Sequence, residues 1–158
     1  MSNTQSMCTS FMGELMTATH NFGTAPTRGT SATDTFKAAL YLTSATVNAS
    51  TTAYSASDEV SGTNYTAGGV TVTAATPPTA TNSSATAGVA FFTPSASITY
   101  TTVTLSTAFD TVLLYNSTQS NKAVSVHTFG SQTITAGTFT LTMPTNNTST
   151  ALLRLSTT

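Results

Sequence analysis

Short apolar runs with a period of two residues fill most of the chain after residue 35. Residues 70–73 and 138–143 alternate strictly between apolar and hydroxyl side chains, so each run would bury one face and expose Thr on the other. Phe36–Leu42 is apolar apart from Lys37, as in a strand that is covered on both faces. These patterns predict β-strands.

The connections between the later runs are short and polar. Residues 109–115 and 124–129 flank the polar loop 116–121, and we expect them to form a β-hairpin. Residues 98–105 also alternate, but the alternation changes phase, and a β-bulge near residues 101–102 would accommodate that change.

Two further breaks are predicted towards the C-terminal end. Ala136-Gly137 is expected to form a tight turn between Ile134 and Phe139. Pro144 ends that strand, and residues 151–155 form a last apolar one. About eight strands with polar turns and no long helix between them predict an all-β fold, either an antiparallel β-sandwich or a jelly-roll-like barrel, with one short N-terminal helix.

The N-terminal segment carries the helical pattern. Over residues 4–19, the apolar positions Met7, Phe11, Met12 and Leu15 form one stripe of a short helix. Such a helix must bury its stripe, either against the sandwich or against a neighbouring subunit.

The division of the chain follows from these patterns. Residues 1–22 are interpreted as an N-terminal helical arm, residues 23–33 as a linker rich in Gly, Pro, Thr and Ser, and residues 34–158 as the β-sandwich domain. Within that domain, residues 74–88 are expected to form a long low-complexity loop.

The composition is unusual in its lack of charge. Charged residues make up 6% of the chain, against roughly 25% in ordinary globular domains, and about a quarter of the residues are Thr. With a net charge of −1 and no basic stripe, nucleic-acid binding is not expected. The N-terminus has neither a signal-peptide pattern nor a membrane span, which predicts a soluble protein made in a cytoplasm. Uncharged strand edges are poorly protected against pairing with other chains, which indicates partner subunits.

Catalytic patterns are weak. Ser, His127 and Asp110 could be written as a triad, but no nucleophile-elbow spacing supports it, and His127 is expected to face solvent.

Asp58-Glu59 is interpreted as a solvated loop, with a cation site as the alternative. Gly68-Gly69 is expected to form a turn that needs positive φ. The single cysteine, Cys8, excludes an intrachain disulfide, and we read it as a small apolar residue of the helix. No catalytic residue, cofactor or metal is therefore predicted.

The candidate residues for a partner interface are apolar. In Phe91-Phe92, adjacent strand side chains point to opposite faces, so one is expected in the core and the other is available to a partner. Together with the helix stripe, these give six candidates: Met7, Phe11, Met12, Leu15, Phe91 and Phe92.

Several longer stretches carry a resemblance. They are Ser10-Phe-Met-Gly-Glu-Leu-Met, His20-Asn-Phe, Asp34-Thr-Phe-Lys-Ala-Ala-Leu-Tyr, Thr52-Ala-Tyr, Glu59-Val-Ser-Gly-Thr-Asn-Tyr-Thr-Ala-Gly-Gly, Ala108-Phe-Asp, Leu114-Tyr-Asn and Ala151-Leu-Leu-Arg-Leu. Over nearly its whole length the chain resembles a family of small β-rich virion structural proteins of tailed bacteriophages. The resemblance implies a virion component made in the bacterial host cytoplasm, and its motifs are structural rather than catalytic.

Among virion roles, the sequence favours a capsid decoration (cement) protein, because a compact β domain with one short arm suits repeated docking on a shell. We expect it to bind the major capsid protein or other virion subunits and to form a homo-oligomer, either a trimer or a dimer, with no nucleic acid and no membrane as partners. A neck or tail component and a tail-associated, adhesin-like binding module remain the alternatives. Carbohydrate binding by such a module is weakened by the absence of Trp.

Overall fold

The computed structural model describes residues 3–16, 18–22, 34–73, 78–81 and 88–156. The expected linker, residues 23–33, lies outside the described residues. The elements in chain order are β1 (Ser6–Met7), α1 (Thr9–Met16), β2 (Phe36–Leu42), β3 (Val70–Val72), β4 (Thr79–Thr81), β5 (Val89–Phe92), β6 (Ile98–Asn116), β7 (Lys122–Leu141) and β8 (Leu153–Ser156).

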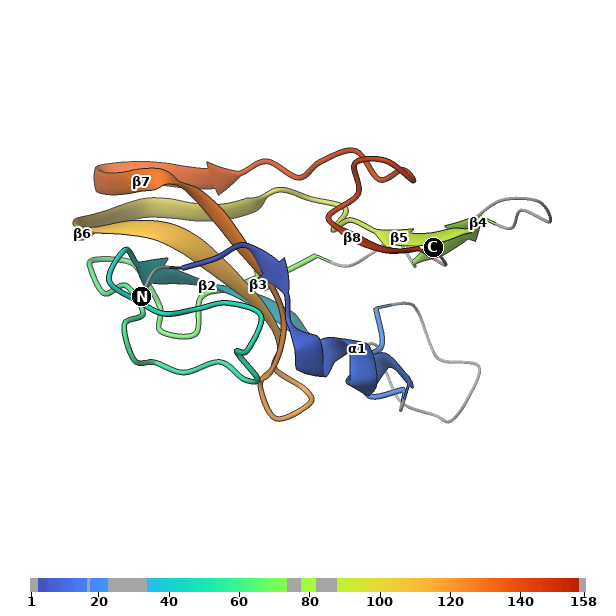
Figure 1. Cartoon of the computed structure of the whole chain (residues 1–158). Coiled ribbons are helices and arrows are strands. Elements are labelled where there is room, and N and C mark those ends of the chain that lie inside the picture. Colours follow the sequence, from blue (N-terminus) through green and yellow to red (C-terminus); the bar gives the residue numbers. More distant parts are fainter. Residues whose placement is uncertain (1–2, 17, 23–33, 74–77, 82–87, 157–158) are drawn as a thin grey trace.

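The strands form two antiparallel sheets, which confirms the all-β prediction with one short helix. Five strands are ordered β1-β7-β6-β2-β3, and three are ordered β4-β5-β8. The jelly-roll alternative is not confirmed. Figure 1 shows the smaller sheet continuing one layer of the molecule beyond the end of β7, on the side where α1 lies.

The β6–β7 hairpin builds most of the sandwich. Its strands are 19 and 20 residues long, and both turn back on themselves, so that the two halves of the hairpin lie in different layers (Figure 1). Repeated register shifts between Tyr100 and Thr111 allow this bend. Phe109 is fully buried there, with its ring 5.9 Å from that of Phe129 and 5.2 Å from that of Phe139.

The predicted hairpin and the first predicted bulge are both confirmed. Leu113 pairs with Val126 across the hairpin, and the register shifts between Tyr100 and Val103. Thr102 sits within that shift with a φ of 53°.

The predicted turn at Ala136-Gly137 is wrong. Both residues lie inside β7, because Val103 pairs with Gly137 and Leu105 pairs with Ile134. The extra residue forms a bulge in which Ala136 has a φ of 46° and its N–H donates to Thr104 Oγ1 at 2.9 Å. The predicted loop 74–88 also contains a strand, β4, which pairs with β5.

The N-terminal helix is shorter than its pattern predicted. Ser6 and Met7 form β1 and pair with Val126 and Ser125 of β7, so backbone pairing with the sheet takes these residues out of the helix. Cys8 and Phe11 are buried in the domain core, and burial raises the pKa of the Cys8 thiol to about 11. The helix therefore packs on its own sandwich.

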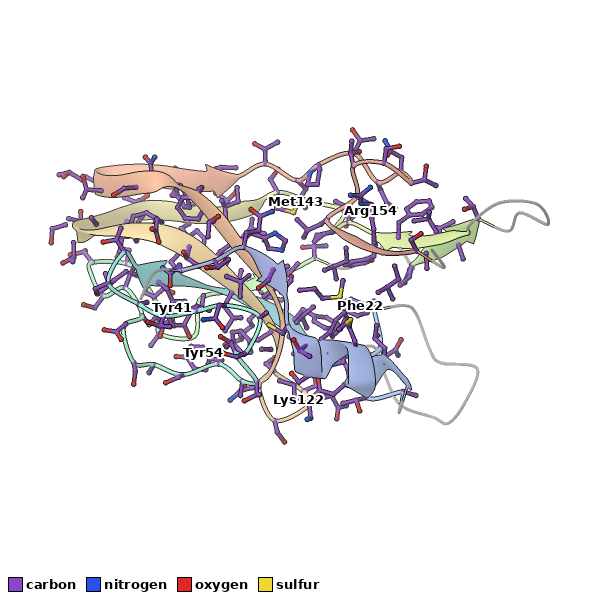
Figure 2. All side chains as sticks on the ribbon, viewed as in Figure 1. Phe22, Tyr41, Tyr54, Lys122, Met143 and Arg154 are labelled. Carbon is purple, nitrogen blue, oxygen red and sulfur yellow. The ribbon has the colours of Figure 1, made fainter. Side chains whose placement is uncertain are left out.

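The long connection between β2 and β3 is held by tyrosine hydroxyls around Glu59. One of these tyrosines, Tyr54, is labelled in Figure 2. Tyr54 and Tyr65 each donate to the Glu59 carboxylate at 2.7 Å, and the Gly68 N–H donates to it at 2.8 Å. Tyr65 Oη also accepts the Leu40 N–H of β2 at 3.0 Å. These side chains supply hydrogen-bond partners to backbone groups in and beside a connection that has little regular secondary structure.

Candidate docking pocket

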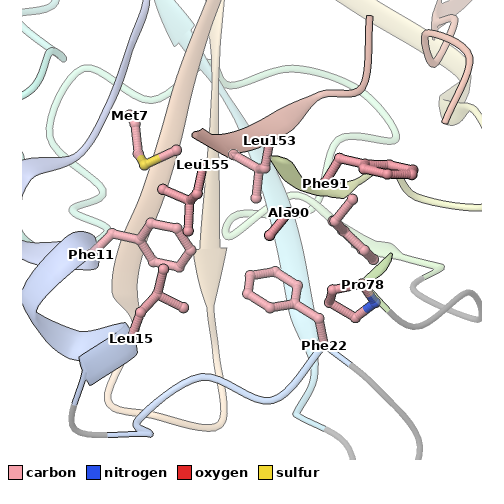
Figure 3. Close-up of a pocket in the computed structure, with 10 residues that line it drawn as sticks. Met7, Phe11, Leu15, Phe22, Pro78, Ala90, Phe91, Leu153 and Leu155 are labelled. Carbon is pink, nitrogen blue, oxygen red and sulfur yellow. The ribbon is translucent and has the colours of Figure 1, made fainter. Parts of the chain in front are cut away.

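An apolar pocket of about 80 Å³ lies between α1 and the three-stranded sheet (Figure 3). One wall comes from the N-terminal segment and the other from β5 and β8, so the pocket lies where separate parts of the chain meet. Its lining consists of Met7, Phe11, Leu15, Phe22, Pro78, Ala90, Phe91, Phe92, Leu153 and Leu155.

The pleat of the small sheet explains the second wall. Ala90 pairs with Leu155 and Phe92 pairs with Leu153, so these four side chains share one face of the sheet. That face is turned towards Phe11 and Leu15 of α1, as Figure 3 shows for the labelled residues. The first wall is made by Phe11 and Leu15 of α1, with Met7 of β1 before the helix and Phe22 after it.

A polar network fixes α1 beside the pocket. Glu14 Oε1 accepts from Lys122 Nζ at 2.6 Å, and Glu14 Oε2 lies 2.7 Å from His20 Nε2. Burial alone raises the pKa of the Glu14 carboxyl, but the hydrogen bonds from Lys122 and His20 and the charge of Lys122 outweigh it and hold that pKa below its usual value. The helix is thus tied to the turn of the β6–β7 hairpin.

The buried amide of Asn116 sets the proton position on His20. Its Nδ2 lies 3.0 Å from His20 Nδ1 and 2.7 Å from Asp34 Oδ2, while its Oδ1 accepts two backbone N–H groups, those of Thr118 and Gln119. Because Nδ2 can only donate, His20 Nδ1 must be an acceptor, and its proton lies on Nε2 towards Glu14. This arrangement is structural, because every one of these groups has a partner within the chain.

Five of the six predicted interface residues come together at the pocket. Met7, Phe11, Leu15, Phe91 and Phe92 line it, although they lie far apart in the sequence. Phe92 is buried and Phe91 is half-buried, as expected for adjacent strand positions. Met12 does not line the pocket; it is 48% exposed on the outer side of α1.

The sequence analysis missed the other half of the lining. Phe22 follows the helix and carries no periodic signal, whereas Leu155 ends the predicted apolar strand 151–155. Leu155 is 41% exposed at the pocket, and it and Met12 are the exposed large apolar residues of the described chain. The alternation of Leu153, Arg154 and Leu155 was the available signal for Leu155.

His127 does not face solvent, so that prediction is wrong. Its ring lines a second apolar pocket of about 120 Å³, between the sheet and the segment that leads to β8, together with Leu114, Met143 and Leu152. Nε2 lies 2.9 Å from Ser125 Oγ. Burial lowers the pKa of His127 to about 4, so the ring is neutral at neutral pH.

The residues of the conceivable triad are not assembled. Asp110 Oδ1 accepts from Asn3 Nδ2 and Thr111 Oγ1, both at 2.8 Å, and no hydrogen bond joins it to His127 in the described part of the chain. The Ser125–His127 pair therefore has no carboxylate to orient it.

The acidic pair is divided between two environments. Asp58 is exposed as expected, but Glu59 is half-buried and its two oxygens are taken by tyrosine and backbone donors. Within the described ranges, no three His, Cys, Asp or Glu side chains gather as a metal site would require. Gly68 and Gly69 have φ values of 87° and 70°, which confirms the predicted turn.

Comparisons with protein-family models, curated proteins and solved structures found no match. In the described part of the chain, no helix has the length and apolar character needed to cross a membrane.

Proposed function

We propose that this protein is a structural subunit of a tailed-bacteriophage virion, a capsid decoration (cement) protein that binds and stabilises the shell of major capsid protein. The apolar docking pocket between α1 and the three-stranded sheet carries the proposal, together with the resemblance of the sequence. In this proposal the protein is made in the bacterial host cytoplasm, acts without catalysis, and has its final place in the virion.

The pocket is suited to one apolar side chain of a protein partner. Its lining is almost wholly carbon, so a charged or strongly polar ligand would lose its hydration there without gaining hydrogen bonds. Burial of one aliphatic or aromatic side chain contributes roughly 1.5–3 kcal/mol. Such a contact is modest at one site, but it is repeated at every copy on a shell.

The distribution of charge supports docking on protein. Residues 60–109 and 123–153 contain no Asp, Glu, Lys or Arg, and they include β4, β5 and most of the β6–β7 hairpin. Because removing a charged group from water costs much free energy, a partner can cover this uncharged surface without that desolvation penalty. The same lack of positive charge argues against nucleic acid as the partner.

Incorporation of pocket variants into virions tests the proposal. In the phage that carries the gene, Leu155→Gln places a polar group at the exposed side of the pocket, and we expect roughly ten- to a hundredfold weaker binding to the particle, from the 1.5–3 kcal/mol of one apolar contact. Met12→Gln is the matched control, because Met12 is similarly exposed but does not line the pocket. Equal incorporation of both variants, with both folded, would contradict docking at the pocket.

A further inference from the structure

We propose that two copies of this chain pair through the open edge of β7, residues 137–141, as antiparallel strands related by a two-fold axis. The inference goes beyond the docking pocket and does not depend on it, because it concerns a different surface and a different partner. It rests on the pairing, charge and side-chain pattern of β7.

One edge of β7 is covered near the hairpin turn and open farther along. Next to the turn, Ser6 and Met7 of β1 pair with Val126 and Ser125, and the Cys8 N–H donates to the Val124 carbonyl at 3.0 Å. From residue 129 to residue 141, β7 pairs with β6 alone among the described residues. The backbone groups on the other side of this stretch are therefore free to pair with another strand.

The usual protections of an edge strand are few here. No charged side chain lies between residues 123 and 153, and Pro144 comes only after the strand has ended. The bulge at Ala136 bends the strand once. Beyond it, Phe139, Thr140 and Leu141 pair in regular register with β6. The extra residue of the shift between Tyr100 and Val103 lies on β6, so residues 137–141 of the β7 edge contain no extra residue.

The side chains of this edge favour a second copy of the same chain. A two-fold axis at Phe139 places Thr138 of one copy opposite Thr140 of the other, on the solvent side of the sheet, where both residues are exposed. The hairpin already contains this kind of contact, because Thr99 Oγ1 and Thr140 Oγ1 lie 3.4 Å apart across β6 and β7. A charged residue close to a two-fold axis would meet its own copy and be repelled, and this edge has no charged residue.

The geometry also fixes the number of copies. Pairing of one edge with the same edge about a two-fold axis is complete when two chains have joined, because the edge of each is then occupied. A dimer follows, in which β6 and β7 of each copy form four adjacent strands across the axis.

The mass of the purified protein in solution tests this inference, by light scattering during size exclusion over a wide range of concentration. We expect twice the 16.2 kDa of one chain at high concentration. Thr140→Lys should shift the protein towards the monomer, and Thr138→Lys combined with Thr140→Lys should abolish the dimer, because it places ammonium groups opposite each other. Thr99→Lys is the matched control: it lies on the same face, on the strand next to β7, and should leave the dimer intact.

A charge-reversal variant tests the register itself. Thr138→Glu combined with Thr140→Lys places opposite charges across the axis and should restore a dimer that weakens with added salt. A wild-type protein that stays monomeric at every concentration, or forms a trimer, would overturn the inference. So would a dimer that the double lysine variant leaves unchanged. These measurements use no virions, so their failure is distinguishable from failure of the docking proposal.

Discussion

The half-buried imidazole of His127 makes the stability of the domain depend on pH. Burial lowers the pKa of His127 from 6.5 to about 4. Between these two pH values the imidazole is mostly neutral in the folded protein and mostly protonated in the unfolded chain. Below pH 6.5 the unfolded state therefore binds more protons, and the free energy of unfolding falls as the pH is lowered. The contribution is fully present above pH 6.5 and is lost as the pH falls through about 4.

The size of the effect follows from the shift. Each pKa unit corresponds to 1.36 kcal/mol, so a change from 6.5 to about 4 amounts to about 3 kcal/mol. Urea unfolding at a series of pH values between 4 and 7.5 measures it. His127→Gln keeps a hydrogen-bonding group near Ser125 Oγ but cannot titrate, and its unfolding free energy should change less by about that amount over the same range. Identical pH dependence in the two proteins would refute the assignment of a half-buried, neutral His127.

Two further substitutions test the connection between β2 and β3, each by thermal or urea unfolding. At Gly69, φ is 70° and an added Cβ would lie 1.6 Å from the Ala38 carbonyl oxygen, so Gly69→Ala should prevent folding or cost several kcal/mol, of the order of the most damaging point mutations. Gly130→Ala, with nothing within 4 Å of the new atom, should be nearly neutral, and an equal loss in both would disprove the close approach. Tyr65→Phe leaves the Leu40 N–H and one Glu59 oxygen each short of a partner, and should cost about 1–3 kcal/mol; no loss of stability would contradict the role of that hydroxyl.

Regular strands could be predicted from the sequence because their burial follows the two-residue period. Phe36–Leu42 has the bounds expected of it, since it lies between β6 and β3 and its apolar run is covered on both faces. The phase change near Thr102 likewise marked a bulge. The local pattern was sufficient for the bounds of β2 although its neighbours β3 and β6 lie far away in the sequence.

Predictions failed where distant segments decide the environment. His127 alternates with Val124 and Val126 as expected, but its face is covered by Met143 and Leu152, which no local pattern connects to it. Glu59 is a different case: Tyr54 and Tyr65 lie only five and six residues away from it, but the connection between β2 and β3 has no regular period that would place their hydroxyls around the carboxylate. The interface candidates were identifiable as apolar positions, but their meeting in one pocket depends on the small sheet, whose register is not local.

The number of copies of this chain in each purified virion tests the central proposal most directly, by quantitative gel densitometry against the major capsid protein. A decoration protein should be present in hundreds of copies, in a fixed ratio to the shell subunit. A dozen copies or fewer would place it instead at the neck or tail, and its absence from purified virions would contradict a structural role in the particle.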